Sequence, residues 1–336
     1  MPIRGAAALS SRADELDVVI DDDGRPNVLV LPIGPIARSA AGALERSSEP
    51  VVAGLAVPCA IAGDEAFCPD RGGAIHRAGL SGGQDRVVAS SRPGSRLAAA
   101  LLGGAHSVYA YLASRQTSEG WVSEAWIGYD DQAAVRLSED GSGATAVALA
   151  PKGASLMALI VDARAALTAM HTRTVDLDHG LRLGEDVVVF VGGPGDRRTA
   201  AALALPPTGP AWGLLPISKD VGDFGLAIVK LEDPPKVEEP VVWSMYPNGL
   251  DPAPIAVAVA RERTWVARVR PQSAEPSSGR ALELGEVREG AGFVASDVLP
   301  TAATPSDVSL AVDSRGALWV AWMDAAGSWV ERVACR

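Results

Sequence analysis

The sequence predicts an all-β protein, a single β-propeller domain over residues 1–336 with seven four-stranded antiparallel blades. Three observations favour this fold. Short alternating or continuous apolar runs recur along the chain, each bounded by Gly, Pro, Asn or Asp. The 35 glycines and 24 prolines interrupt the chain too often for long helices. The runs also group in fours, and the groups repeat every 40 to 56 residues, about the spacing of propeller blades.

The C-terminal stretch shows the blade pattern most clearly. Residues 307–312 alternate polar and apolar, a tight turn follows at residues 313–316, and residues 317–323 form a second alternating run. A third run covers residues 329–334, so this blade has one strand fewer than the others. A spare strand at residues 3–9 predicts that the N-terminal strand completes the last blade and closes the ring, which removes an exposed edge.

The innermost strands are rich in Ala, Val and Leu, which suit strands that crowd around a narrow axis, as at residues 98–102, 144–150 and 256–260. The eight tryptophans fall mostly in second or outer strands, where their large rings are expected to pack between blades. One innermost strand is expected per blade. The expected starting positions are residues 16, 57, 96, 144, 198, 254 and 308.

Composition excludes several classes of partner. The net charge of −11 and the absence of a basic stripe argue against nucleic acid and against an anionic membrane surface. No segment approaches eighteen uncharged apolar residues, so no membrane span is expected. The N-terminal residues lack the apolar core of a secretory signal. We therefore expect a cytoplasmic protein, or a periplasmic or secreted one if a signal peptide was removed.

The three cysteines leave two interpretations open. Cys59 and Cys68 flank a turn at Gly63 and Asp64, and a two-residue hairpin there would place the two cysteines opposite each other. Facing positions of an antiparallel pair can form a disulfide, which would suggest an oxidising compartment. Alternatively, both are small buried apolar residues. Cys335 would in either case be unpaired.

Two stretches resemble known propeller repeats. Residues 73–83, GAIHRAGLSGG, resemble the G-x-I-x-R-x-x-L-x-G-G stretch of YWTD-type and related bacterial propellers. Residues 312–320, VDSRGALWV, are similar to the D-x-x-G-x-(L/I)-(Y/W)-V turn of NHL-like and Asp-box-like repeats. Each motif covers about one blade and consists of turn residues, so the resemblance implies the fold and says little about activity.

Propellers place their ligand site at one mouth of the central channel, which is an argument by analogy between folds. Loops that lead into innermost strands and loops that join second to third strands meet there. The candidate catalytic residues at this mouth are Glu15, Arg96, Asp196, Arg197, Asp251 and Asp307. The candidate metal ligands are Asp14, Asp140, Asp223, Asp251 and Asp307, because Ca²⁺ takes six to eight oxygen ligands. Asp before a strand is also ordinary turn chemistry, and this explanation stays open for each residue.

The blades differ in length and share few side chains, which favours one asymmetric central pocket over a regular protein-binding platform. We therefore expect a small-molecule or glycan site, with a metal-assisted hydrolase of an ester, lactone or phosphoester as the favoured activity, since a cation can polarise the attacked group. The alternative is a non-catalytic propeller that binds a ligand or a protein partner. Carboxylates about 5–10 Å apart across the channel would favour glycoside hydrolysis, and a flat apolar patch would favour a protein partner.

Overall fold

The structure is a computed structural model, and the part of the chain that it describes contains strands and no helix. It describes residues 59–333 except residues 71, 80–84, 94, 104, 119, 165–166, 178–179, 193–200, 220–222, 244–254, 272–279, 300, 302–304, 306, 314 and 325–326. Before residue 59 it describes the backbone of five strands. Within these residues there is no helix long and apolar enough to cross a membrane.

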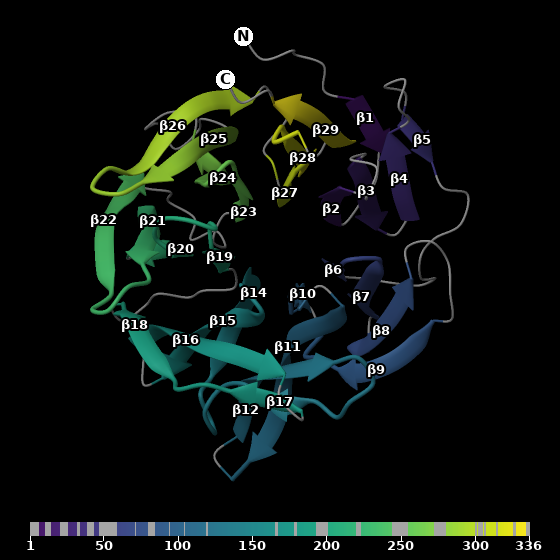
Figure 1. Cartoon of the computed structure of the whole chain (residues 1–336), viewed down its shortest axis with the longest axis vertical. Coiled ribbons are helices and arrows are strands. Elements are labelled where there is room, and N and C mark those ends of the chain that lie inside the picture. Colours follow the sequence, from purple (N-terminus) through teal and green to yellow (C-terminus); the bar gives the residue numbers. More distant parts are fainter. Residues whose placement is uncertain are drawn as a thin grey trace.

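The described strands form seven antiparallel sheets arranged in a ring (Figure 1). Each sheet has four strands in succession, and one sheet carries a fifth. The innermost strands are β2 (Glu15–Ile20), β6 (Ala60–Ala62), β10 (Ala98–Leu102), β14 (Ala144–Lys152), β19 (Ala202–Ala204), β23 (Ile255–Ala260) and β27 (Asp307–Val312). The second strands are β3 (Pro26–Leu31), β7 (Glu65–Pro69), β11 (His106–Thr117), β15 (Ser155–Arg164), β20 (Trp212–Lys219), β24 (Arg263–Pro271) and β28 (Leu318–Asp324).

The outer half of each blade completes the ring. The third strands are β4 (Gly34–Arg38), β8 (Ala74–Gly79), β12 (Gly120–Tyr129), β16 (Leu167–Leu177), β21 (Asp223–Lys230), β25 (Arg280–Arg288) and β29 (Gly327–Val333). The outermost are β5 (Leu44–Arg46), β9 (Arg86–Ser90), β13 (Val135–Arg136), β17 (Leu181–Leu183), β18 (Val187–Val191), β22 (Lys236–Trp243), β26 (Gly292–Leu299) and β1 (Ala7–Ser10). The chain is a β-propeller with four-stranded antiparallel blades, as the sequence predicts.

The first strand closes the ring, as predicted. β1 pairs antiparallel with β29, with Ala7 opposite Val330 and Ala8 opposite Trp329. The blade that begins at β27 therefore takes its outermost strand from the other end of the chain. The predicted strand began earlier, at residue 3, and residues 1–6 lie outside the described part.

One blade departs from the predicted pattern. The apolar pattern of residues 187–191 predicts its fourth strand, but β17 occupies that position beside β16. β16 is eleven residues long, so it pairs with β17 at Val175–Leu177 and with β18 at Ala169–Thr172. The apolar run at residues 187–191 correctly predicts a strand, whereas the short β17 has too little apolar pattern to be detected.

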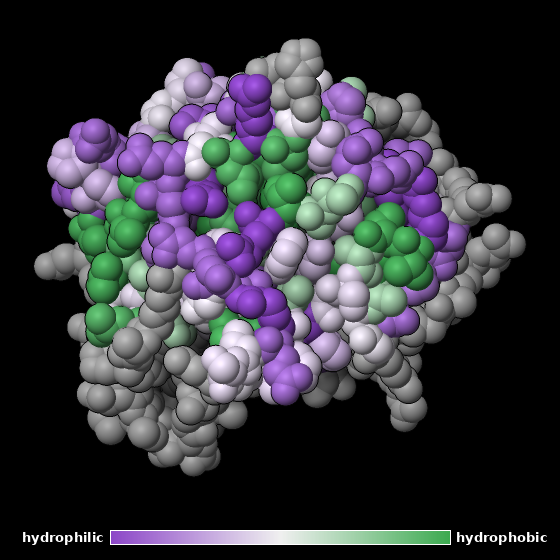
Figure 2. Space-filling view, turned by 90° about the horizontal axis from the view of Figure 1, so that it is seen from below, coloured by the Kyte–Doolittle hydropathy of each residue, from purple (hydrophilic) through white to green (hydrophobic). Residues whose placement is uncertain are grey.

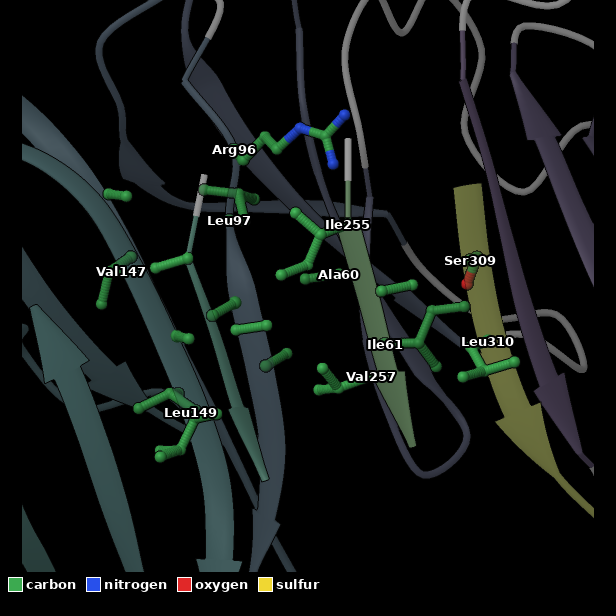
Figure 3. A pocket seen from close by; sticks show the side chains of 18 of the residues that line it. Ala60, Ile61, Arg96, Leu97, Val147, Leu149, Ile255, Val257, Ser309 and Leu310 are labelled. Carbon is green, nitrogen blue, oxygen red and sulfur yellow. The ribbon is translucent and has the colours of Figure 1, made fainter. Parts of the chain in front are cut away.

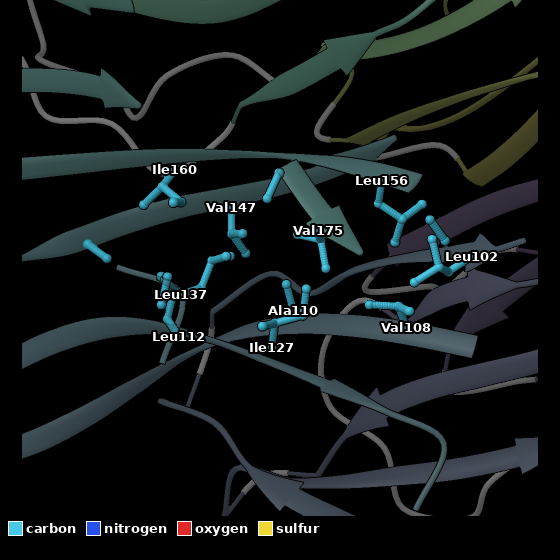
Figure 4. Packing of buried hydrophobic residues seen from close by; sticks show 14 residues of the cluster. Leu102, Val108, Ala110, Leu112, Ile127, Leu137, Val147, Leu156, Ile160 and Val175 are labelled. Carbon is cyan, nitrogen blue, oxygen red and sulfur yellow. The ribbon is translucent and has the colours of Figure 1, made fainter. Parts of the chain in front are cut away.

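Apolar side chains pack between neighbouring blades. Successive residues of a strand point to opposite faces, so Val108 and Ala110 of β11 pack towards the β14 blade while Tyr109 and Tyr111 pack towards the β6 blade. Figure 4 shows the first of these layers, with Leu156 and Ile160 of β15 facing the β10 blade. The other layers join further pairs of blades in the same way. Second-strand tryptophans contribute as predicted, since Trp212, Trp265, Trp319 and Trp322 are all buried.

Two hairpins use the same aspartate turn. Asp313 Oδ1 accepts hydrogen bonds from the N–H groups two and four residues later, at 2.9 Å each. Asp70 Oδ1 does the same, at 2.8 Å each. Three residues after each aspartate stands a glycine with positive φ, Gly73 at 91° and Gly316 at 75°, a conformation that other residues rarely adopt. The turn at Asp313 lies within the stretch 312–320, and the turn at Asp70 ends at Gly73, the first residue of the stretch 73–83.

Leu156 lies between two blades and is fully buried, whereas Leu167 is 46% exposed. We expect Leu156→Ala to lower the free energy of unfolding by about 2–5 kcal/mol, because the lost apolar contacts leave a cavity. Leu167→Ala is the matched control and should change the free energy of unfolding by less than about 1 kcal/mol. Urea-induced unfolding, monitored by tryptophan fluorescence, measures this free energy for both variants. Equal effects would contradict the assignment of the inter-blade layer as the core.

Asp313 is a second stability determinant. Burial raises the pKa of its carboxyl, but hydrogen bonds from the Ala317 N–H, the Trp319 indole and Arg332 bring the pKa below the ordinary value. A lowered folded pKa means that the stabilisation is present above the unfolded pKa, about 3.9, and is lost as pH falls through the folded pKa.

We therefore expect Asp313→Asn to lower the free energy of unfolding by about 1–3 kcal/mol at pH 7, because hydrogen bonds to a charged carboxylate are lost. The difference in stability between the variant and the wild-type protein should become smaller below about pH 4. Thermal unfolding at pH 7, 5 and 3.5 measures this dependence. A difference independent of pH would show that the charge of Asp313 is not what stabilises the turn.

Candidate functional site

A cavity of about 340 Å³ lies on the propeller axis, where the innermost strands begin. Residues of β6, β10, β14, β19, β23 and β27, or residues directly before these strands, line it. This is the channel mouth at which the sequence predicts a ligand site. The wall is mostly apolar, as Figure 3 shows for Ile61, Leu97, Val147, Val257 and Leu310.

The composition of the innermost strands explains this wall. Alanine recurs in all but one of the strands that line the cavity, and short side chains leave space where the strands approach the axis. Polar groups are few among the described lining side chains. They are Arg96, Thr145, Asp307 and Ser309.

Arg96 and Asp307 meet across the mouth. Arg96 Nη2 donates to Asp307 Oδ1 at 2.8 Å, although 211 positions separate the two residues in the sequence. Arg96 lies just before β10 and Asp307 begins β27, and two blades lie between them in the ring (Figure 1). In Figure 3 the Arg96 guanidinium lies at one end of the cavity, beyond the apolar side chains. The sequence named both residues as candidates but did not predict that they form a pair.

Burial sets the character of this ion pair. The Asp307 side chain is 5% exposed and that of Arg96 is 38% exposed. A buried carboxylate is costly unless it is paired, so Asp307 depends on its cationic neighbour. Arg96 is in turn held in place at a position that solvent reaches. The pair therefore presents an oriented guanidinium at the opening of an apolar cavity.

A disulfide lies in the wall of the same cavity. Cys59 and Cys68 are bonded, and their Cα atoms are 4.2 Å apart. Cys59 stands directly before β6 and Cys68 lies in β7, one step beyond the pair of Ala60 with Phe67. The structure thus decides between the two interpretations of these cysteines in favour of the bond. Cys59 lines the cavity, so the bond fixes the innermost strand of this blade at the mouth.

Asp140 does not line the cavity. It forms ion pairs with Arg115 and Arg136, and both arginines also contact the fully buried Glu124. Burial raises the pKa of the Glu124 carboxyl, but the hydrogen bonds from Arg115 and from the Gly141 N–H bring the pKa below its ordinary value. Asp140 thus belongs to a network that ties β12 to the loop before β14.

The remaining predicted residues are only partly described. Glu15 and Asp223 are described by their backbone, at the first residues of β2 and β21. Asp14, Asp196, Arg197 and Asp251 lie outside the described part. Among the described residues no three His, Cys, Asp or Glu side chains lie close enough together to hold a metal ion. The Ca²⁺ site predicted from the sequence stays a prediction.

A second cluster of ionisable groups surrounds His171. His171 Nε2 lies 3.2 Å from Asp162 Oδ2, and its Nδ1 lies 3.3 Å from Asp186 Oδ1. These three residues come from β15, β16 and the segment before β18. No local spacing signals the cluster, because the pairing of β15 with β16 and of β16 with β18 brings its members together. They lie outside the lining of the cavity, and we assign them a structural role.

No known protein family and no curated protein matches the chain. Solved structures match its fold. U3-55K has 13% identity and a TM-score of 0.56, and the match covers 97% of this chain and 98% of that one. The N-terminal domain of Nup159 has 10% identity and a TM-score of 0.53, with 96% and 90% covered. A protein of unknown function from Dyadobacter fermentans has 10% identity and a TM-score of 0.54, with 99% and 100% covered. At these identities the likeness supports the propeller fold and nothing finer.

Proposed function

We propose that this propeller binds a small organic molecule in the cavity at its channel mouth. The observation that carries the proposal is the Arg96–Asp307 pair at the opening of an apolar cavity of about 340 Å³. Ligand sites are usually mostly apolar, with a few polar groups that fix the orientation of the ligand. Their volumes run from about 300 to 1,000 Å³, so this cavity suits a small ligand.

The lining favours an aliphatic acid. No aromatic side chain and few hydrogen-bonding groups occur among the described lining residues, which suits hydrocarbon better than the hydroxyl-rich surface of a glycan. A guanidinium binds carboxylates through two parallel N–H donors. We therefore assign the head group of the ligand to Arg96 and its aliphatic body to the wall formed by Val147, Val257 and Leu310.

Asp307 has an orienting role in this proposal. Its carboxylate holds Arg96 at the opening, and the five N–H donors of a guanidinium allow a second carboxylate to bind the same side chain. The disulfide beside the cavity stabilises the wall on which the ligand rests. Since disulfides persist mainly in oxidising compartments, the same bond favours a protein that works in one.

Ca²⁺ takes six to eight oxygen ligands, and Asp307 is the only carboxylate among the described lining residues. Binding requires only the groups described above. For this reason we place ligand binding first, and we treat hydrolysis as an outcome that the experiments below can reveal.

The first test is binding of straight-chain carboxylates from butanoate to decanoate by isothermal titration calorimetry. We expect Arg96→Ala to weaken binding about 10- to 100-fold, the effect of losing a charged hydrogen bond worth about 1.5–3 kcal/mol. Arg86→Ala is the matched control, because Arg86 is also ion-paired and half-exposed but lies outside the cavity. The corresponding alcohols should bind more weakly than the acids.

A second variant separates binding from folding. Val257→Phe should fill part of the cavity and abolish binding while leaving the Arg96–Asp307 pair intact. The proposal fails if no acid of the series binds, or if the arginine and valine variants bind as well as the wild-type protein.

Removal of metal tests the hydrolase expectation. We expect chelator-treated protein to bind the same carboxylates with unchanged affinity, because the proposed contacts involve no cation. Mass spectrometry of the untagged protein before and after chelation measures its metal content. About one Ca²⁺ per chain, together with chelator-sensitive cleavage of ester, lactone or phosphoester substrates, would instead support the hydrolase.

A further inference from the structure

The β11–β12 hairpin has the longest strand pairing of the described chain. It pairs continuously from Val108 opposite Tyr129 to Thr117 opposite Gly120. Thr117 Oγ1 also donates to the Gly120 carbonyl at 2.9 Å, which closes the turn. Figure 1 shows this hairpin projecting beyond the ring at the bottom of the view. The tip of such a hairpin gains no packing between blades, so packing does not explain why the hairpin extends this far.

Trp121 stands at this tip with 72% of its surface exposed. The other tryptophan side chains that the structure describes are buried or half-buried. They are Trp126, Trp212, Trp265, Trp319, Trp322 and Trp329. The prediction that tryptophans pack between blades is therefore wrong for Trp121. A large apolar ring held in water is a costly arrangement that binding of a partner can relieve.

Hydrogen-bonding groups share the face of Trp121. Gln116 lies directly opposite Trp121 across the hairpin, and Ser114 lies opposite Ser123 one step further. Positions two apart on a strand point to the same face, so the indole, the amide and the two hydroxyls lie together. Ser114 and Gln116 are exposed, whereas the Ser123 Oγ is buried and lies out of reach of a ligand. None of these four side chains, on the face of the hairpin that carries Trp121, is charged.

The opposite face holds the hairpin rigid. Arg115 donates to Glu124 at 2.9 Å and is ion-paired with Asp140, and the Gly141 N–H donates to Glu124 at 3.1 Å. These contacts anchor the strands just behind Trp121 to the loop before β14. A binding group on an anchored strand pair loses little conformational entropy when its ligand binds.

We infer that the Trp121 face of this hairpin binds a neutral saccharide. One side of a sugar ring is lined by C–H groups that can stack on the indole, and its edge carries hydroxyls for the exposed Gln116 and Ser114. The described side chains of this face are uncharged, which suits an uncharged ligand. A protein partner would need a broad apolar surface, whereas on the side seen in Figure 2 hydrophilic residues divide the apolar side chains into separate patches.

The experiment uses the full chain and three neutral insoluble polysaccharides, cellulose, chitin and a β-1,3-glucan. Depletion from solution measures binding, and tryptophan fluorescence with the matching oligosaccharides measures affinity. We expect at least one polysaccharide to retain the protein. Trp121→Ala should weaken that binding by more than about 10-fold, as truncation of a central aromatic contact does. Trp121→Phe should restore part of the affinity, and Gln116→Ala should reduce it several-fold.

Matched controls make the result specific. Val298→Ala removes an exposed apolar side chain from another blade and should leave binding unchanged. Arg96→Ala should also leave it unchanged, so the outcome is independent of the channel site. The inference is overturned if none of the three polysaccharides retains the protein, or if Trp121→Ala binds as well as the wild-type chain. It is equally overturned if Trp121→Ala converts a dimer to a monomer in sedimentation, because a second copy would then be the partner.

Discussion

Packing between blades is the interaction on which the rest of the structure depends. Each blade is a small sheet with two apolar faces, and a face is removed from water only when the next blade is present. β11 illustrates this, because alternate residues of one strand contribute to two different layers. Stability is therefore shared around the ring, and the cavity at its centre exists because the innermost strands carry small side chains where they converge.

The cavity and the closure of the ring are linked through the β27 blade. This blade supplies Asp307 to the mouth and receives β1 at its outer edge. Arg96 reaches Asp307 from a blade on the far side of two others, so the ion pair joins parts of the ring that share no packing layer. The same contact that shapes the candidate site thus also links two non-adjacent blades across the mouth.

Local sequence patterns predicted those features that depend on neighbouring residues. Alternation and turn residues located the innermost strands to within four residues, since β6 begins at Ala60 and β19 at Ala202 where residues 57 and 198 were expected. The disulfide was foreseeable as one of two alternatives because Cys59 and Cys68 flank a single tight turn. Pairing of β1 with β29 followed from counting strands in the last blade.

Features that depend on distant residues were not predictable in the same way. The pairing of Arg96 with Asp307 requires the curvature of the ring, which no local pattern encodes. Asp140 has the same position before an innermost strand as other candidates, yet nearby arginines hold it in a different network. Trp121 has the alternation of a buried strand residue, and only the length of the β11–β12 hairpin places it in solvent.

The pairing of β1 with β29 also affects how the chain folds during its synthesis. A chain synthesised from its N-terminus makes β1 first and β29 about three hundred residues later. At a translation rate of about 5–20 residues per second, β1 waits for tens of seconds without its partner. During that interval the apolar blade faces that the closed ring buries still lack their last partner, and exposed apolar surface of this kind favours aggregation.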